Sequence, residues 1–330
     1  MPPHPNSLLD LRSLDAGVIR GLLIRAREMR EPDAAVEPTL AGHTVATLFF
    51  ENSTRTRVSF TIAAQRLGGS VVDLAASASS VAKGESLADT ARTIEAMGVS
   101  AMVVRAAQSG AVGVIARAVK CPVINAGDGQ HEHPTQALAD ALTIADSFES
   151  AHDFDLAGLR VGIVGDVLHS RVARSNAHGL TKLGAHVTLV GPEPMAPDRL
   201  ARGLPITLSR DLDAVLGTLD VVMMLRIQLE RGAGALLASP AQFRAGFGLT
   251  ADRAATLKPG ALIMHPGPMN RGVEIDDAVA DGLVGPGRPV IWDQVANGVV
   301  VRMAALEACI GPIASPAGVS AASTRATVTS

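Results

Sequence analysis

The most distinctive chemistry of the chain lies in a short polar run, STRTR, which follows the apolar segment HTVATLFF. The run extends from Ser53 to Arg57 and brings hydroxyl and guanidinium groups together without any glycine. Ser53 stands where a helix N-cap belongs, so the next backbone N–H groups would lack helical partners. Such a helix start favours an anion, and arginine adds forked hydrogen-bond donors. The run therefore predicts a phosphate site, and the structural alternative is an ordinary cap with solvated arginines.

The absence of one motif restricts which phosphate compounds this site could bind. No GxxxxGKS or GxxxxGKT run, the phosphate loop of nucleoside triphosphatases, occurs in the sequence. The phosphate therefore belongs to a smaller molecule, or it is held in another way.

Two further residues stand where a substrate carbonyl group can be polarised. Arg105 ends the apolar run MVVR, and His133 directly precedes Pro134 in HPTQALAD. Proline suits the first turn of a helix, so His133 is expected at a helix start. An imidazole N–H placed there can donate to a carbonyl oxygen as negative charge develops on it. His131 is the alternative, and a histidine before a proline is by itself more often a plain loop residue.

Composition excludes several classes of function. The net charge of −3 over 330 residues, with only 7 Phe, 1 Trp and no Tyr, disfavours nucleic acids and anionic membranes as partners. The 2 cysteines make neither a disulfide framework nor a metal-ligand spacing. The N-terminus lacks the pattern of a signal peptide, and no apolar stretch approaches the ~18 residues of a membrane span. We therefore expect a cytoplasmic protein without membrane spans.

Strands and helices alternate around these residues, which is typical of parallel sheets covered by helices. Short apolar runs predict strands at 43–50, 70–75, 101–105, 122–127, 160–166, 186–191, 220–226 and 261–268. Helical spacing predicts helices at 13–30, 53–67, 86–98, 110–119 and 133–148, one ending at 184 and one ending near 311. In the first two helices, the expected buried side chains are Val18, Leu22, Ile24, Val58, Ile62 and Leu67, with Ser13 as the first cap.

This alternation predicts an α/β fold with two doubly wound parallel-sheet domains of similar size, joined by helices. The polar stretch 149–158 separates the two series of strands. In such sheets, ligands bind beyond the carboxyl ends of the strands, which is where STRTR, Arg105 and HPTQ stand. Residues 312–330 consist mostly of Ala, Ser, Thr, Pro and Gly, and we expect them to be a disordered tail.

Four motifs, STRTR, HPTQALAD, LRIQLER and HPGPMNRGVEID, resemble in order and spacing those of the catalytic chain of aspartate carbamoyltransferases. The resemblance covers residues 7–310. It implies a carbamoyl-phosphate-binding domain of residues 1–135 plus 291–311 and an aspartate-binding domain of residues 136–290. It also implies a homotrimer with shared active sites, and it leaves open a larger assembly with regulatory or dihydroorotase chains.

The resemblance implies substrate contacts at particular positions. Those for carbamoyl phosphate are Ser53, Thr54, Arg55, Thr56, Ser79, Arg105, His133, Gln136, Gly267 and Pro268. Those for L-aspartate are Lys83, Arg171, Arg226 and Gln228. The implied catalytic residues are His133, Arg105, Thr56 and Lys83. In the family, the loop that corresponds to SASSVAKGESLADT reaches into the neighbouring subunit's site and would carry Lys83 and Ser79 there.

The carbamoyl nitrogen has its own implied contacts. Gln136 would hold the carbamoyl NH2 group, as would the backbone carbonyls of Gly267 and Pro268, with a cis bond before Pro268. Many relatives carry a larger apolar residue in place of Gly267, but a backbone contact does not need a side chain. His265, just before this turn, is expected to be structural.

The implied reaction is transfer of the carbamoyl group from carbamoyl phosphate to the amine of L-aspartate, in the pathway of pyrimidine biosynthesis. The products are N-carbamoyl-L-aspartate and phosphate. The amine attacks directly, and neither a metal nor a cofactor is expected. Phosphate is the proposed proton acceptor, because no carboxylate base is matched in the motifs.

The sequence leaves three alternative functions to compare with this one. An ornithine carbamoyltransferase should show an Asp before a Ser-Met-Gly turn and a Cys in an HCLP motif, whereas this chain has Arg226, Arg231 and HPGP. A dinucleotide-dependent dehydrogenase is suggested by RVGIVGD, but Gly162 and Gly165 do not complete GxGxxG. A catalytically silent assembly partner should lack Lys83 or His133, and both are present.

Overall fold

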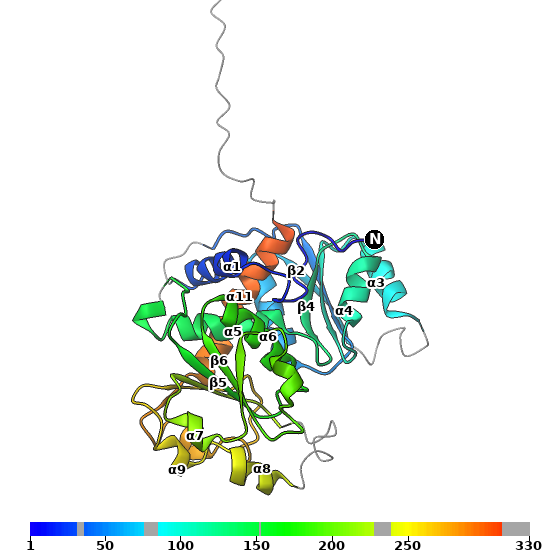
Figure 1. The fold of residues 1–330 in the computed structure, drawn as a ribbon. Helices are drawn as coiled ribbons and strands as arrows, with labels where there is room; N and C mark the ends of the chain where they lie inside the picture. The colour runs from blue at the N-terminus through cyan, green and yellow to red at the C-terminus, as the bar shows by residue number, and fades with distance from the viewer. Residues whose placement is uncertain (32–35, 76–84, 152, 228–238, 312–330) are drawn as a thin grey trace, which may run out of the picture.

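The computed structural model describes residues 1–31, 36–75, 85–151, 153–227 and 239–311. Three residues of the predicted site, Ser79, Lys83 and Gln228, lie outside these residues, as does the tail at 312–330. The molecule contains two parallel sheets (Figure 1). Each sheet with the helices beside it is called a half of the molecule below. Within the described ranges, no helix is both long enough and apolar enough to cross a bilayer.

The first sheet has four strands, all parallel, in the order β2-β1-β3-β4. The strands are β1 (Thr44–Phe49), β2 (Ser70–Ala75), β3 (Ala101–Ala106) and β4 (Val123–Asp128). The helices of this half are α1 (Ala16–Glu28), α2 (Thr54–Arg66), α3 (Leu87–Ala96) and α4 (Ala111–Ala118). The chain leaves β1 toward β2 and later returns to the other side of β1 as β3. The strand order therefore reverses between β1 and β3, where ligands of doubly wound sheets bind.

The second sheet has six strands in the order β10-β9-β8-β5-β6-β7. They are β5 (Arg160–Val164), β6 (His186–Val190), β7 (Ile206–Ser209), β8 (Val221–Met224), β9 (Leu262–Met264) and β10 (Arg288–Pro289). The helices of this half are η3 (Glu149–Ala151), α6 (Arg171–Lys182), η4 (Asp198–Ala201), α7 (Asp213–Leu216), α8 (Pro240–Phe247), α9 (Ala251–Ala254) and α10 (Asp277–Ala280). Its order reverses between β5 and β8, which gives the second half a ligand-binding edge of its own.

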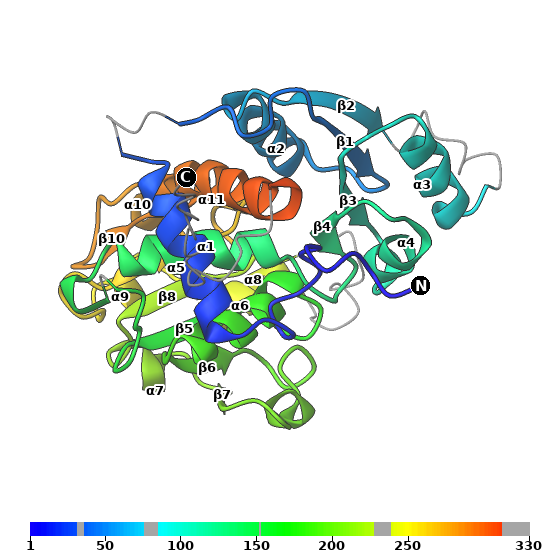
Figure 2. The ribbon, with the colours of Figure 1, turned by 90° about the horizontal axis from the view of Figure 1, so that it is seen from above.

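Two long helices lie between the sheets and join them. α5 (Pro134–Ala145) and α11 (Ile291–Ile310) pack against each other, and α11 also contacts α1 and α2. Figure 2 shows α1 crossing α5 and α11, with α2, β1 and β2 above these helices and β4 to one side of them. Nearly every residue of α5 is buried, so this helix is enclosed on all sides rather than half exposed as an amphipathic surface helix would be. One core cluster runs through these helices and into both sheets.

Two expected details of the helices are wrong. α1 begins after Asp15 rather than Ser13, and it buries Ile19 and Leu23 while Val18 is 51% exposed. Likewise α2 buries Phe60, whereas the expected core residue Val58 is 49% exposed. The buried residues recur three or four positions apart and so form one stripe along each helix, from which the expected positions are offset.

Candidate active site

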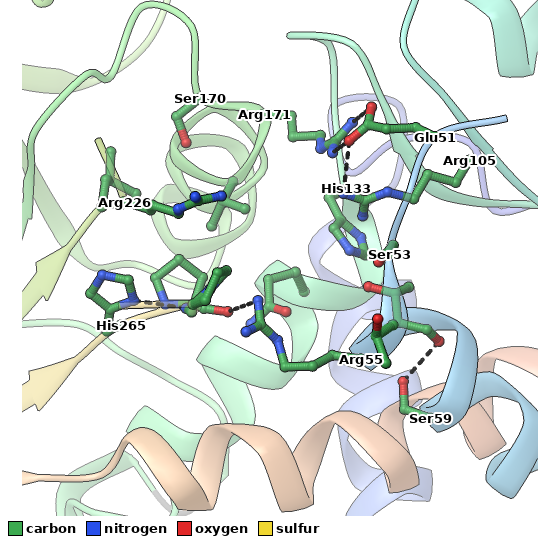
Figure 3. Close-up of a pocket in the computed structure, with 18 of the residues that line it drawn as sticks. Glu51, Ser53, Arg55, Ser59, Arg105, His133, Ser170, Arg171, Arg226 and His265 are labelled. Atoms are coloured by element: carbon green, nitrogen blue, oxygen red, sulfur yellow. Dashed lines mark hydrogen bonds and ion pairs between the residues drawn. The ribbon is translucent and has the colours of Figure 1, made fainter. Parts of the chain in front are cut away.

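A cavity of about 770 Å³ lies where the reversal points of the two sheets face each other. Residues that follow β1 and end β3 line one side, and residues that follow β5, β8 and β9 line the other. Figure 3 shows the side chains of both halves turned toward this space. The cavity brings together Ser53, Thr54, Arg55, Thr56, Arg105, His133, Gln136, Arg171, Arg226, Gly267 and Pro268.

The N-terminus of α2 forms one wall of the cavity. Ser53 is the N-cap residue, as expected, but its side chain makes no capping hydrogen bond. Its hydroxyl group and the first N–H groups of α2 can therefore serve a bound anion. Thr56 lies one turn inside and is buried, whereas Arg57 faces Asp73 at 3.4 Å and lies over the ring of Phe49.

Arg55 reaches across the cavity toward the other half. Its Nη2 donates to the carbonyl of Pro266 at 3.5 Å, a long contact between the two halves. Burial, and then the nearby charge of Arg226, lower the pKa of Arg55 from its usual value. Two guanidinium groups that repel each other in this way are stabilised by an anion between them.

Glu51 holds two of the predicted arginines in the described structure. Its Oε1 accepts from Arg105 Nη2 at 3.1 Å and from Arg171 Nη2 at 2.8 Å (Figure 3). Arg105 also donates to the carbonyl of Ala126 at 3.1 Å. Arg105 ends β3 and Arg171 begins α6, so one carboxylate joins the two halves. The sequence analysis did not single out Glu51, although an acid two residues before STRTR is an available signal.

His133 is the N-cap residue of α5 and is almost fully buried. Its backbone N–H donates to Ser175 Oγ at 2.8 Å, while its Nδ1 has no hydrogen-bond partner in the described part of the chain. Burial, and then the charges of Arg105, Arg302 and Arg171, hold the pKa of His133 well below its ordinary value. The imidazole is therefore neutral at physiological pH. His131 instead faces Asp128 at 3.1 Å and does not line the cavity.

The side chain of Gln136 is hydrogen-bonded to the buried carboxylate of Asp140. Its Nε2 donates to Asp140 Oδ1 at 2.9 Å, and Asp140 also accepts from Gln294 at 2.9 Å and from Asn176 at 2.7 Å. Because its NH2 group is engaged in this way, Gln136 offers its amide oxygen to the cavity. Burial raises the pKa of Asp140, and the three donors oppose that effect. Sequence reasoning also missed Asp140, the one acid between His133 and Asp146 of an otherwise apolar helix.

The turn after β9 supplies the backbone of the opposite wall. The peptide bond between Gly267 and Pro268 is cis, as expected. His265 fixes this turn, because its Nδ1 accepts the N–H of Gly267 at 2.7 Å and its Nε2 contacts Glu274 at 3.1 Å. Gly267 has φ of +65°, and a Cβ at this position would lie 2.9 Å from Nη1 of Arg55. Glycine therefore leaves room for Arg55 in this arrangement.

The electrostatics of the cavity favour anions. Five arginines line it, namely Arg55, Arg105, Arg171, Arg226 and Arg302. Glu51 is the single carboxylate among the described lining residues. Nor does the described part of the chain contain three or more His, Cys, Asp and Glu side chains placed to hold a metal ion. The arrangement suits ligands that carry several negative charges.

Two family models match the chain over most of its length. Residues 6–146 match the carbamoyl-phosphate-binding domain of aspartate/ornithine carbamoyltransferases, and residues 157–309 match their Asp/Orn-binding domain. The aspartate carbamoyltransferase catalytic subunit of Rhodospirillum rubrum is 54% identical over 280 residues, which are 85% of each chain.

Solved structures show the same architecture. An ornithine carbamoyltransferase from Pyrococcus furiosus superposes with a TM-score of 0.82 at 30% identity, covering 94% of this chain and 98% of its own. An aspartate transcarbamoylase from Trypanosoma cruzi, in complex with aspartate and phosphate, gives 0.79 at 30% identity, covering 93% and 95%. Both likenesses extend over the two sheets and the helices between them. The chain belongs to the aspartate/ornithine carbamoyltransferase family.

Proposed function

We infer that this chain is the catalytic chain of an aspartate carbamoyltransferase. It transfers the carbamoyl group of carbamoyl phosphate to the amine of L-aspartate, a step of pyrimidine biosynthesis. The 54% identity to a catalytic subunit of that enzyme carries the inference. The arginine-lined cavity between the sheets supports it, because carbamoyl phosphate carries a charged phosphate group and aspartate carries two carboxylates, which arginines attract.

The phosphate of carbamoyl phosphate is proposed to lie at the start of α2. The hydroxyl groups of Ser53 and Thr54 and the first N–H groups of the helix would donate to it, with Arg55 and Arg105 beside them. Since Glu51 already accepts from Arg105, the incoming phosphate competes with this carboxylate for the guanidinium group. Ser79 is proposed as a further phosphate ligand.

His133 is proposed to polarise the carbamoyl carbonyl. As a neutral imidazole it donates one N–H to the oxygen, and Thr56 and Arg105 add donors as that oxygen gains negative charge. Donors of this kind are worth roughly 3–4 kcal/mol each. Gln136 would accept the carbamoyl NH2 through its amide oxygen, together with the backbone carbonyls of Gly267 and Pro268.

In the proposed reaction, the two substrates react directly with each other while these donors hold them. The neutral amine of aspartate attacks the carbonyl carbon, the new C–N bond forms, and the C–O bond to phosphate breaks. The departing phosphate is proposed to take the proton of the amine. Holding the two substrates face to face lowers the barrier by up to ~7–11 kcal/mol.

Arg171 and Arg226 are proposed to hold the two carboxylates of aspartate, with Gln228 and Lys83. They flank the reversal point of the second sheet, opposite the phosphate site. Ornithine would instead need a carboxylate for its side-chain cation. Glu51 is the one described lining carboxylate and is already held by two arginines, so the geometry favours aspartate.

We also propose an oligomeric state and domain limits for the chain. A homotrimer in the cytoplasm would let Lys83 and Ser79 reach the neighbouring subunit's cavity. The domains would comprise residues 1–135 plus 291–311 and residues 136–290. Light scattering of the purified protein tests the trimer, and a monomer at working concentrations would contradict it.

The test of function is phosphate release from carbamoyl phosphate with L-aspartate, L-ornithine or no amine. We expect release that depends on aspartate alone. Arg55→Gln should lower kcat/KM by about 100-fold or more, because it removes a charged phosphate ligand. Arg57→Gln, the matched control, should change it by less than about 3-fold, because Arg57 faces Asp73 outside the cavity. Turnover of ornithine without turnover of aspartate would overturn the inference.

A further inference from the structure

A second cavity, of about 330 Å³, lies along α6 and shares no described lining residue with the first. It is bounded by the N-terminal segment, by α6, and by the chain from η4 to β7. Arg171 and Val172 of α6 face the active site, whereas Arg174 and His178 line this second cavity.

Four arginines at this cavity have guanidinium groups that make no hydrogen bond or ion pair in the described part of the chain. They are Arg12, Arg174, Arg199 and Arg202. The carboxylate of Asp198, next to Arg199 in the sequence, forms an ion pair with Arg210 at 2.6 Å. Some exposed arginines elsewhere pair with acids, as Arg244 does with Asp276 at 2.7 Å. The described lining of the cavity contains no acid, so its cations are available to a ligand.

Apart from His178, the rest of the described lining is apolar. Val167, Leu189, Leu204 and Ile206 contribute hydrocarbon surface beside the arginines. A hydrated inorganic ion would gain no binding free energy from such a surface. An organic molecule would gain binding free energy by burying its own apolar part against it.

The surroundings of His178 report the positive potential of the cavity. Burial, and then the charges of Lys182, Arg12 and Arg174, lower the pKa of His178 to about 4, against a smaller opposing effect of Asp10. The Lys182 ammonium group itself donates to three backbone carbonyls, those of Leu11, Arg12 and Leu14. His178 therefore meets a ligand as a neutral donor or acceptor.

We propose that this cavity binds a small organic anion, with its carboxylate, phosphate or sulfonate group against the arginines and its apolar body against the strand side chains. Its volume is within the usual range for small-molecule pockets, about 300–1,000 Å³. Arg12 belongs to the segment that pairs with β4 through Leu8 and Ile124, and the other arginines belong to the second half. A bound ligand thus touches both halves of the molecule.

Anilinonaphthalene sulfonate, an aromatic anion whose fluorescence rises in apolar sites, is the probe. We expect saturable binding to the folded protein, and about 10-fold weaker binding to Arg199→Gln/Arg202→Gln, because two charged donors are lost. The matched control is Arg66→Gln/Arg288→Gln, which removes two exposed arginines far from the cavity and should change affinity by less than about 2-fold. Turnover with aspartate, which should be unchanged, and circular dichroism verify that the variants are folded.

A third variant separates the two cavities. Arg55→Gln/Arg226→Gln alters the active site alone and should leave probe affinity unchanged. Loss of probe binding in that variant instead would place the probe in the active site and overturn the proposal. Equal affinity in the wild type and Arg199→Gln/Arg202→Gln would overturn it as well, as would the absence of saturable binding.

Discussion

The neutral state of His133 determines how the site can polarise a carbonyl. Three arginine charges and burial disfavour the imidazolium form, so the ring carries one N–H and no charge. A neutral donor strengthens its hydrogen bond only as the carbonyl oxygen gains charge, which stabilises the transition state more than the bound substrate.

Replacing His133 should therefore affect kcat more than binding. We expect His133→Ala to lower kcat by about 100- to 1,000-fold with KM for carbamoyl phosphate changed by less than about 5-fold. In the wild type, the pH profile of kcat/KM should show no inflection from this imidazole between about pH 6 and 8, since its pKa lies well below 6.5. An inflection present in the wild type and absent from His133→Asn would contradict the neutral donor.

Asp140 is inferred to orient Gln136, and its replacement tests that role. In Asp140→Asn, an amide group must face three amide donors, so at least one of them turns away. We expect KM for carbamoyl phosphate to rise by about 10-fold with a smaller change in kcat. Asp146→Asn, at the end of the same helix, pairs with Arg27 and Arg30 away from the cavity and serves as the control.

The double variant Gln136→Ala/Asp140→Asn should be little worse than Gln136→Ala alone, because the carboxylate acts through that side chain. Fully additive losses would show that Asp140 serves only the stability of the core.

Single residues were partly predictable because motif chemistry is local. The STRTR run, His133 and Arg226 carry donor groups that an anionic substrate requires, and each follows a strand. Glu51 and Asp140 were missed, since their function lies in which donors they accept from. Arg171 and Gln294, their partners, lie far away in the sequence, and only the packing of the two halves brings them together.

At the scale of elements, α6 connects two arginine-lined cavities. Its first residue, Arg171, donates to Glu51 in the first cavity, while Arg174 and His178 in its later turns line the second. His178 stands among those arginines, and its pKa of about 4 has a consequence for stability. The unfolded chain takes up a proton near pH 6.5, whereas the folded chain resists it until about pH 4.

Stability should accordingly be full above about pH 6.5 and should fall as the pH drops toward 4, where the folded protein also binds the proton. We expect His178→Gln to lose less stability than the wild type between pH 7 and 5, by about 1 kcal/mol after allowance for partial exposure. Urea unfolding at both pH values measures this, with His186→Gln, an exposed histidine of β6, as the control. Equal losses in the wild type and His178→Gln would contradict the shift.

The sequence predicted the central strands and the long helices, but it did not predict the short strands at the sheet edges. The central strands and the long helices have apolar runs that tertiary contacts reinforce, so their existence follows from pattern alone. β7 and β10 were missed because they are short edge strands of 4 and 2 residues with few buried side chains. The helix faces were misjudged at Val18 and Val58 because both helices carry apolar residues on their exposed sides as well.

At the scale of the molecule, the site exists only where two halves meet. The wall at the start of α2 and the wall formed by the turns after β5, β8 and β9 come from different sheets, and Glu51 joins them through Arg105 and Arg171. We expect closure around two substrates to rearrange such contacts between the halves.

Glu51→Gln should weaken this connection. Without the negative charge, the guanidinium groups of Arg105 and Arg171 repel each other, and Arg171 is no longer drawn toward Arg105 and the first half. We expect the KM for aspartate to rise by about 10-fold. Saturation curves with aspartate measure it, and Glu307→Gln, which breaks the remote pair with Arg25, is the control. An unchanged KM in Glu51→Gln would show that the carboxylate does not align the halves.

The return of α11 to the first half has a consequence for how the protein is made. This helix is the last described element to leave the ribosome, yet it packs on α1, α2 and α5 and places Arg302 in the lining of the cavity. The first half therefore emerges with the apolar surface that α11 covers still exposed, and its core closes only when residues 291–310 have been made. A nascent chain halted before that helix would expose this surface to chaperones, however completely its first sheet had formed.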